Sequence, residues 1–301
     1  MGTIGLQIVL ERKQSMIHSG ELLGERDGLR VIDCAACGFA HLETLPNGAS
    51  LIEFYRSDFW QKYKAGALDR LLAQYDWWLE TYGGWLELVE RHVKGRRLFD
   101  VGCGYGFLME AAREMNWNAD GIEPNDSAAI YAKQYGAVTR GTWQEYKYGM
   151  YDCVAALWLM EHLPDPLQFL EWCRLRLDDD GVLLVVVPND FTGIQDEANR
   201  LVRKPFYWID KTHLCYFSWS SFSNLLGRAG FRIIERQTLY PMENFLFRGD
   251  DYTVDDELGA RRHDEISQAE LRMPRVERLG YYHSLALDGR GREIVVMAVK
   301  E

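Results

Sequence analysis

An acidic residue and three closely spaced glycines occur together in the segment Asp100-Val-Gly-Cys-Gly-Tyr-Gly106. The glycines lack a Cβ atom, so the backbone can turn tightly there and approach a ligand closely. A second acid, Glu123, follows about twenty residues after the first glycine, at the end of an apolar stretch, where such folds hold a ribose. The pattern predicts a loop for a nucleotide-type cofactor, with Glu123 on the two ribose hydroxyls. A surface acid at a turn is the alternative role for Glu123.

The spacing of the glycines indicates which cofactor the loop accepts. A dinucleotide loop has the pattern G-x-G-x-x-G and holds a pyrophosphate at a helix N-terminus. Here the third glycine comes one residue early, and Asp100 would repel a phosphate. An acid suits a ligand that carries an ammonium group and no phosphate, which describes S-adenosylmethionine (SAM). Asp100 could also organise the loop by accepting hydrogen bonds from backbone amides.

Several segments resemble motifs of the class I SAM-dependent methyltransferases. Residues 100–106 resemble the first motif, and residues 151–166 resemble the fourth strand and its turn, Glu161-His-Leu-Pro-Asp-Pro166. Residues 177–189 resemble the fifth strand behind an acidic turn, and four later segments resemble a bacterial subgroup: 187–191, 213–218, 229–231 and 291–296. The resemblance covers about residues 50–300. The third motif departs from it, because Arg140-Gly-Thr-Trp-Gln144 stands where many relatives have an acid near the adenine.

The resemblance implies a cofactor site beyond the carboxyl ends of the strands, where open α/β sheets bind ligands. The expected cofactor residues are Tyr63, Asp100, Gly102, Cys103, Gly104, Gly106, Phe107, Glu123, Pro124, Thr142, Trp143, Leu157 and Trp158. Tyr63 and Trp158 are expected to face the sulfonium, since a cation is attracted to an aromatic face. Simple packing is the alternative role for both aromatic residues.

Two histidines are candidates for catalysis. Methyl transfer from a sulfonium mainly requires alignment, and a hydroxyl acceptor also benefits from a base worth ~10²–10⁴-fold in rate. His162 follows the fourth predicted strand, and His213 lies among aromatic residues before the next helix. We favour His213 as a base on the substrate side, with His162 on the cofactor side. The alternatives are a packed, structural His213 and a His162 that bonds to its own turn.

A Cys-Ala-Ala-Cys-Gly element occupies residues 34–38. Cys34 and Cys37 resemble the second of two Cys-x-x-Cys pairs that form a zinc knuckle in related enzymes. The first pair is missing, a closed zinc site normally has four ligands, and only His18 and His41 remain nearby as substitutes. We therefore expect a degenerate element without metal, with retained zinc as the alternative.

Apolar strands alternate with amphipathic helices in the second and third hundred residues. This alternation predicts an α/β fold with a doubly wound, mostly parallel sheet, and the resemblance makes it seven-stranded and Rossmann-like. The expected division is an N-terminal segment with cap helices over residues 1–94 and a SAM-binding core over 95–240. An insertion, acting as lid or oligomerisation segment, follows over 241–291, and a final core strand over 292–301. Strands are expected at residues 97–101, 119–123, 153–157, 182–187, 231–237 and 292–299.

Composition limits the partners and the compartment. The 301 residues carry a formal net charge of −11, which argues against nucleic acid or an anionic membrane surface as the main partner. No run approaches the ~18 apolar residues of a membrane span, and the first residues lack a secretory pattern. Six cysteines in a chain of this size are not a disulfide framework. We expect a cytoplasmic protein with reduced thiols.

The sequence thus predicts a SAM-dependent methyltransferase with a small-molecule substrate. We expect O-methylation of a sugar or another hydroxylated metabolite, with N- or C-methylation in a natural-product or polysaccharide pathway as the alternative. The sequence leaves the oligomeric state open, and a homodimer is one possibility. A nicotinamide-dependent oxidoreductase is disfavoured by the loop spacing and by the absence of a Tyr-x-x-x-Lys constellation. A non-catalytic module that binds the cofactor is the remaining alternative.

Overall fold

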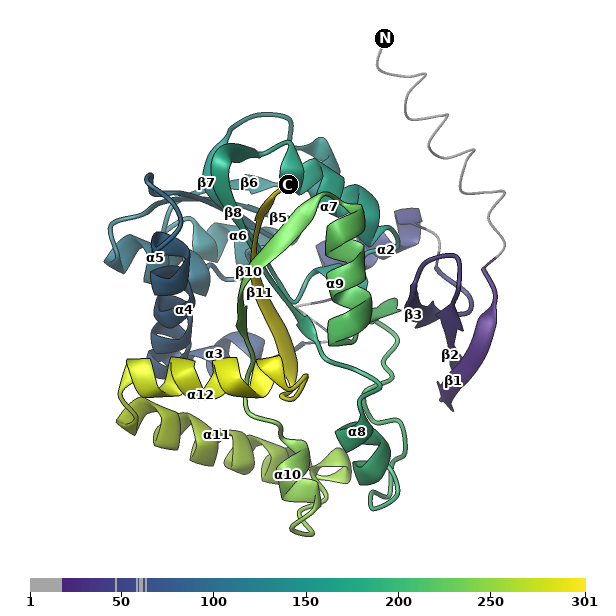
Figure 1. Ribbon diagram of the computed structural model, residues 1–301. Coiled ribbons are helices and arrows are strands. Elements are labelled where there is room, and N and C mark those ends of the chain that lie inside the picture. The colour runs from purple at the N-terminus through teal and green to yellow at the C-terminus, as the bar shows by residue number, and fades with distance from the viewer. Residues whose placement is uncertain (1–17, 47, 58, 60–61, 63) are drawn as a thin grey trace.

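A seven-stranded sheet lies at the centre of the computed structural model, which describes residues 18–46, 48–57, 59, 62 and 64–301 (Figure 1). The strands are β4 (Arg97–Val101), β5 (Asn118–Glu123), β6 (Ala137–Arg140), β7 (Tyr151–Leu157), β8 (Leu177–Pro188), β10 (Phe231–Gln237) and β11 (Glu293–Lys300). Their order is β10-β11-β8-β7-β4-β5-β6. Strands β4 to β8 pair in parallel, and β11 is antiparallel to both neighbours. The expected doubly wound, mostly parallel sheet is confirmed.

Both faces of this sheet are buried, which explains the continuous apolar runs of its strands. In β8, Leu183 and Val185 belong to one core cluster, and Leu184 and Val186 belong to the other. Helices α4 (Tyr75–Glu90) and α5 (Phe107–Glu114) supply one cluster, and α7 (Pro166–Arg174) and α9 (Trp219–Arg228) supply the other. The central strands are therefore packed from two sides and held rigidly at their carboxyl ends.

Local capping signals fix several helix ends. The side chain of Asp165 accepts a hydrogen bond from the amide of Gln168 at 3.1 Å, so α7 begins at Pro166 as predicted. Helix α9 ends before Gly230, whose φ of 75° favours glycine. Helix α6 (Asp126–Ala132) begins directly after its N-cap Asn125, whose side chain accepts a hydrogen bond from the amide of Ala128 at 3.1 Å.

A second sheet of four strands occupies the N-terminal region, beside α9 (Figure 1). It contains β1 (Gly20–Arg26), β2 (Leu29–Cys34), β3 (Phe39–Leu42) and β9 (Cys215–Tyr216). An N-terminal segment with cap helices was expected over residues 1–94, and a sheet in this segment was not predicted. Asp27 and Gly28 form the β1–β2 turn with φ of 52° and 79°, so the Asp-Gly pair was the available hairpin signal.

Helical segments complete the fold on either side of the core. The N-terminal part contains α2 (Gly48–Ser57) and α3 (Ala67–Ala73). Residues 241–291 form α10 (Glu243–Leu246), the short η4 (Tyr252–Val254), α11 (Asp256–Arg272) and α12 (Arg275–Leu287). Helix α11 packs on α4, where the indole of Trp77 donates a hydrogen bond to Glu270 at 2.8 Å. Within the described part of the chain, no helix is long and apolar enough to cross a membrane.

Candidate active site

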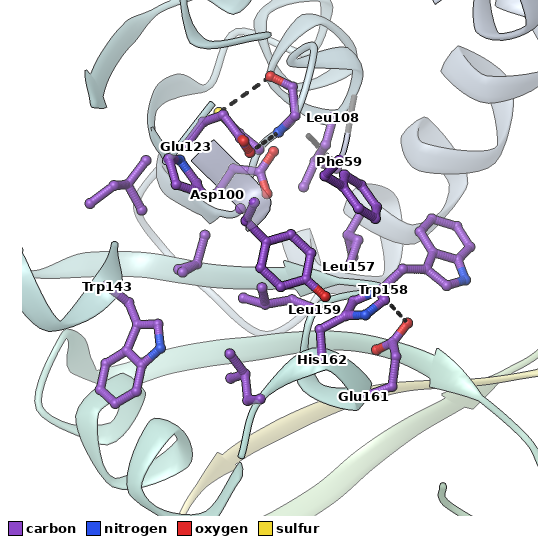
Figure 2. Close-up of a pocket in the computed structure, with 18 of the residues that line it drawn as sticks. Phe59, Asp100, Leu108, Glu123, Trp143, Leu157, Trp158, Leu159, Glu161 and His162 are labelled. Carbon is purple, nitrogen blue, oxygen red and sulfur yellow. Dashed lines mark hydrogen bonds and ion pairs between the residues drawn. The ribbon is translucent and has the colours of Figure 1, made fainter. Parts of the chain in front are cut away.

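A cavity of about 510 Å³ opens at the carboxyl ends of the parallel strands (Figure 2). Its volume falls in the range of about 300–1,000 Å³ that is usual for small-molecule sites. The structure places twelve of the thirteen expected cofactor residues on its wall: Asp100, Gly102, Cys103, Gly104, Gly106, Phe107, Glu123, Pro124, Thr142, Trp143, Leu157 and Trp158. Tyr63 lies outside the described residues. Both candidate histidines line the same cavity.

The glycine loop between β4 and α5 has a conformation that requires its glycines. Gly102, Gly104 and Gly106 have φ of 72°, 51° and 81°. At Gly106 a Cβ atom would also meet the Cβ of Ala132 at 2.8 Å, so this glycine is needed for space as well. The carbonyl of Ile122 accepts hydrogen bonds from the amides of Gly102 and Cys103, which ties the loop to β5.

Two buried carboxyl groups lie at the loop end of the cavity, as Figure 2 shows. Glu123 accepts hydrogen bonds from the amides of Gly104 and Asn125, each at 3.0 Å. It is 5% exposed, which rules out the alternative of a surface acid. Burial, and next the charge of Glu123, raise the pKa of Asp100 to about 8. This end of the cavity therefore favours a ligand that brings positive charge.

The third motif forms another edge of the cavity. The amide of Thr142 donates a hydrogen bond to Glu145 at 2.7 Å, and the Thr142 hydroxyl donates to the same carboxylate at 3.3 Å. Trp143 is buried, with its ring 5.4 Å from that of Phe169. Glu145 thus organises this turn, but it is not among the residues that line the cavity.

Trp158 joins an aromatic cluster on the wall of the cavity. Its ring lies 5.7 Å from that of Trp78 and 6.2 Å from that of Trp85, measured between centroids. Its backbone has a φ of 49°. These contacts support the packing role directly, and attraction to a sulfonium stays a prediction.

His162 has its ring orientation fixed by the backbone at the other end of the cavity (Figure 2). Its Nδ1 lies 2.7 Å from the carbonyl oxygen of Thr212, which can only accept, so Nδ1 carries the proton. In the neutral ring Nε2 then keeps a free lone pair. Burial, and next the neighbouring His213, lower the pKa of His162 to about 3. The imidazole is therefore neutral near physiological pH and can accept a proton.

His213 stands beside His162, with 5.1 Å between the ring centroids. Its Nδ1 is buried and has no hydrogen-bond partner among the described residues. Burial lowers the pKa of His213 to about 4, although Asp210 acts in the opposite direction. The two neutral imidazoles share one half of the cavity, so the geometry does not divide them between a cofactor side and a substrate side.

Charged residues that were not predicted from the sequence also line this half. Glu161 is buried, and desolvation raises its pKa well above the ordinary value. Ligand atoms of Glu161, His162 and His213 lie within 4.8 Å of one another, a set that could hold a divalent cation. Arg292 also reaches the cavity and forms an ion pair of 3.2 Å with the buried Asp190. In the sequence, Arg292 could have been noticed only as a charged residue directly before the apolar final strand.

Helix α2 covers the same half and is anchored to the cofactor half. The ring of Tyr55 lies 5.6 Å from that of His162, and the ring of Phe59 lies 6.0 Å from it. The side-chain amide of Asn125 donates a hydrogen bond of 2.8 Å to the carbonyl of Arg56. Asn125 follows Glu123 by two residues, so α2 is connected directly to the expected ribose site.

The fold and this cavity define the class of protein. A family model described as a methyltransferase domain matches residues 82–236, just over half of the chain. The chain belongs to this family, and its core is that of the class I SAM-dependent methyltransferases. The resemblance seen in the motifs is thereby confirmed.

Individual relatives are more distant. The chain is 32% identical over 103 residues to a ubiquinone biosynthesis O-methyltransferase of Actinobacillus pleuropneumoniae serotype 7 (strain AP76), covering 30% of this chain and 44% of the relative. It is 30% identical over 108 residues to the protein of the same name from Bordetella avium (strain 197N), covering 32% and 44%. The chain thus spans less than half the length of these curated relatives.

Solved structures share the fold at low sequence identity. Magnesium protoporphyrin IX methyltransferase from Synechocystis PCC 6803 with bound SAH has a TM-score of 0.53 and 12% identity, and the match covers 85% of this chain and all of that one. The plantazolicin methyltransferase in complex with SAH has a TM-score of 0.51 and 15% identity, with 83% and 94% covered. At these identities the similarity shows the fold alone.

Proposed function

We propose that the protein transfers the methyl group of SAM to a hydroxyl oxygen of a small molecule. The observation that carries this proposal is the hydrogen bond from Nδ1 of His162 to Thr212, which leaves Nε2 as a proton acceptor in the cavity. SAM supplies a methyl group that is already activated and leaves as S-adenosylhomocysteine (SAH), with the electrons of the broken carbon–sulfur bond on sulfur. The acceptor oxygen forms the new bond to carbon, and its proton passes to Nε2.

The residues of the loop end fit the cofactor. Buried Glu123 is the carboxylate that we assign to the ribose hydroxyls, and its bonds to the amides of Gly104 and Asn125 fix its orientation. Asp100 provides a carboxyl group for the ammonium group, and the glycine loop allows close approach. Thr142 and Trp143 are the residues that we assign to the adenine edge.

The other half of the cavity suits an acceptor with a large apolar surface. Its wall contains Leu51, Ile52, Tyr55, Phe59 and Leu163 besides the two histidines, and Glu161 and Arg292 are its charged members. This lining supports a ring or chain that bears a hydroxyl more than an unsubstituted sugar, which would need more hydrogen-bonding partners. The name of the curated relatives, ubiquinone biosynthesis O-methyltransferase, adds support for a hydroxylated small molecule. Cytoplasmic location, lack of a nucleic-acid partner and a homodimer stay predictions from the sequence.

His162 is the base that we propose, and His213 is its positioning neighbour. The sequence favoured His213, but the fixed proton on Nδ1 gives only His162 a defined free lone pair. The lowered pKa keeps Nε2 of His162 unprotonated at neutral pH, but it also makes this imidazole a weaker base than one with a pKa near the working pH.

The proposal is tested by measuring SAH formation with purified protein, SAM and a panel of phenols, catechols, aliphatic alcohols and sugars. We expect turnover with hydroxylated apolar acceptors and O-methyl products by mass spectrometry. Calorimetry in parallel should show binding of SAM and SAH and none of NAD. Tight NAD binding without a response to SAM or SAH would overturn the assignment, and N-methyl or C-methyl products would replace the proposed acceptor atom.

A further inference from the structure

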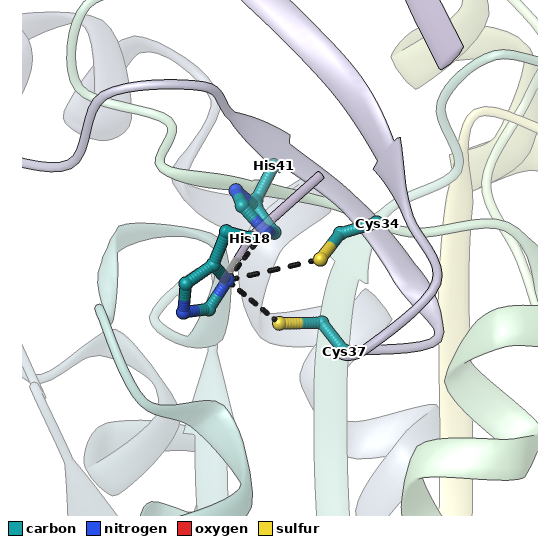
Figure 3. Close-up of side chains that lie close together, drawn as sticks. All are labelled: His18, Cys34, Cys37 and His41. Atoms are coloured by element: carbon teal, nitrogen blue, oxygen red, sulfur yellow. Dashed lines mark hydrogen bonds between the residues drawn. The ribbon is translucent and has the colours of Figure 1, made fainter. Parts of the chain in front are cut away.

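Four side chains with metal-ligating atoms lie together at the end of the N-terminal sheet, away from the active-site cavity (Figure 3). Cys34 is the last residue of β2, Cys37 lies in the following turn, and His41 lies in β3. His18, which precedes β1, completes the cluster. Segments separated along the chain thus bring two thiols and two imidazoles to one point.

The distances within the cluster match a tetrahedral zinc site. Nδ1 of His18 lies 3.4 Å from Sγ of Cys37, 3.7 Å from Sγ of Cys34 and 3.2 Å from Nε2 of His41. All four ligand atoms lie within 4.8 Å of one another. Bond lengths of about 2.3 Å to sulfur and 2.0–2.1 Å to nitrogen, at tetrahedral angles, place nitrogen and sulfur about 3.6 Å apart and two nitrogens about 3.3 Å apart.

The surroundings of His41 orient it as a ligand. Its Nδ1 lies 2.7 Å from the carbonyl oxygen of Leu42, so Nδ1 donates and Nε2 presents its lone pair to the cluster. A backbone acceptor behind the ligating imidazole is the usual outer contact of a metal-bound histidine. Nδ1 of His18 lies 3.2 Å from Nε2 of His41, so a single cation could be coordinated by both nitrogens.

The turn between the two cysteines is also built for ligation. The amide of Gly38 donates a hydrogen bond of 2.8 Å to the carbonyl of Cys34, which closes the turn. Gly38 has a φ of 76°, and its position has open space except for Arg228 at 3.5 Å, so conformation is the reason for glycine. The guanidinium of Arg228 donates to the carbonyl of Cys37 and fixes the turn against α9.

We propose that His18, Cys34, Cys37 and His41 bind one zinc ion in a closed, structural site. Two thiolates and two imidazoles are a ligand set that suits zinc, and four protein ligands leave no open position for catalysis. The ion would fasten His18 and the β2–β3 turn together. This assignment replaces the degenerate element expected from the sequence, because the two histidines supply the ligands of the missing cysteine pair.

The first test is the metal content of the full chain, purified under reducing conditions without a polyhistidine tag. Elemental analysis by mass spectrometry should find about one zinc per chain. The double variant Cys34→Ser/Cys37→Ser should lose it, whereas His92→Gln, which changes a histidine outside the cluster, should keep it. The His18→Ala variant should lose zinc to a mild chelator that leaves the parent loaded. Zinc retained fully by the double variant would overturn the proposal.

A second measurement does not depend on the folding of variants. Zinc in the parent protein is exchanged for Co²⁺, and the visible spectrum is recorded. We expect the absorption of a tetrahedral site together with thiolate-to-cobalt charge transfer, and a lower melting temperature after chelation. A parent chain with less than about a tenth of an equivalent of zinc, and no such spectrum after addition of Co²⁺, would refute the site. Neither result depends on methyl-transfer activity.

Discussion

The two halves of the active-site cavity are built in different ways. The cofactor half comes from short loops after adjacent parallel strands, and its main elements are backbone amides, glycines and the acids Asp100 and Glu123. The acceptor half collects side chains from α2, the turn after β7, the segment before β9 and the start of β11. Cofactor binding therefore depends on local backbone geometry, and acceptor chemistry depends on distant segments that meet only in the folded chain.

The sharpest test of this division is the His162→Ala variant. It should reduce kcat by ~10²–10⁴-fold through loss of the base, while calorimetry shows an unchanged Kd for SAH. The matched variant His162→Asn keeps a donor for the Thr212 carbonyl and lacks the base, so it should lose turnover to the same extent. The loss should shrink at high pH, where a phenolic acceptor ionises unaided.

His213→Ala provides the comparison within the acceptor half. We expect a smaller loss of kcat than for His162→Ala, and a higher pKa of His162 because His213 lowers it in the parent. If His213→Ala abolishes turnover and His162→Ala does not, then His213 is the base, as the sequence favoured.

The corresponding change in the cofactor half is Glu123→Ala. Loss of charge-assisted hydrogen bonds to the ribose, worth about 1.5–3 kcal/mol, should weaken SAH binding by ~10–150-fold. Glu123→Gln, which retains one acceptor oxygen, should show an intermediate Kd in the same titration. A chain that binds SAH with the parental Kd after Glu123→Ala would show that the ribose is held elsewhere.

The smallest expected effect is the pH dependence that Asp100 confers on cofactor binding. Because burial and Glu123 raise its pKa to about 8, the empty native state holds this proton between about pH 4 and 8, and its stability falls as the pH rises through that window. The ammonium group of SAH favours the ionised carboxylate. Affinity should therefore rise by up to about tenfold per pH unit between pH 6 and 8 and then level off, with proton release on binding.

The matched control for this dependence is Asp100→Asn. It removes the ionisation while it keeps the size of the side chain, so its affinity for SAH should vary little between pH 6 and 8. Calorimetry in buffers of different ionisation enthalpy counts the released protons. An equal slope in parent and variant would assign the pH dependence to another group.

Elements built from local segments could be predicted from the sequence, and elements built from distant segments could not. The bounds of β4 and β10 were predicted to the residue, because each is a distinct run between turn or capping signals. The N-terminal sheet was missed although Asp27-Gly28 marks its first hairpin, and its strand β9 has only two residues and pairs with β3 across a large separation in sequence. No local pattern encodes such a pairing.

The site shows the same limit at the level of single residues. The glycine loop and Glu123 could be found from spacing, since one βα unit and the next strand contain them. Tyr55 could not, because it reaches the cavity through packing between remote segments, and Arg292 carried only the weak signal of a charged residue before an apolar strand. Glu161 stood inside a recognised motif, but only its burial reveals a carboxyl group with a raised pKa.

The hydrogen bond from Asn125 to the carbonyl of Arg56 has a consequence for the kinetics of the enzyme. It makes the last turn of α2 depend on the chain beside Glu123, and Tyr55 on that helix faces the base. A bound cofactor that immobilises Glu123 and Asn125 would therefore also fix the position of α2, against which the acceptor packs. Substrates should then add in a compulsory order, SAM before acceptor, and product inhibition by SAH should be competitive with SAM alone.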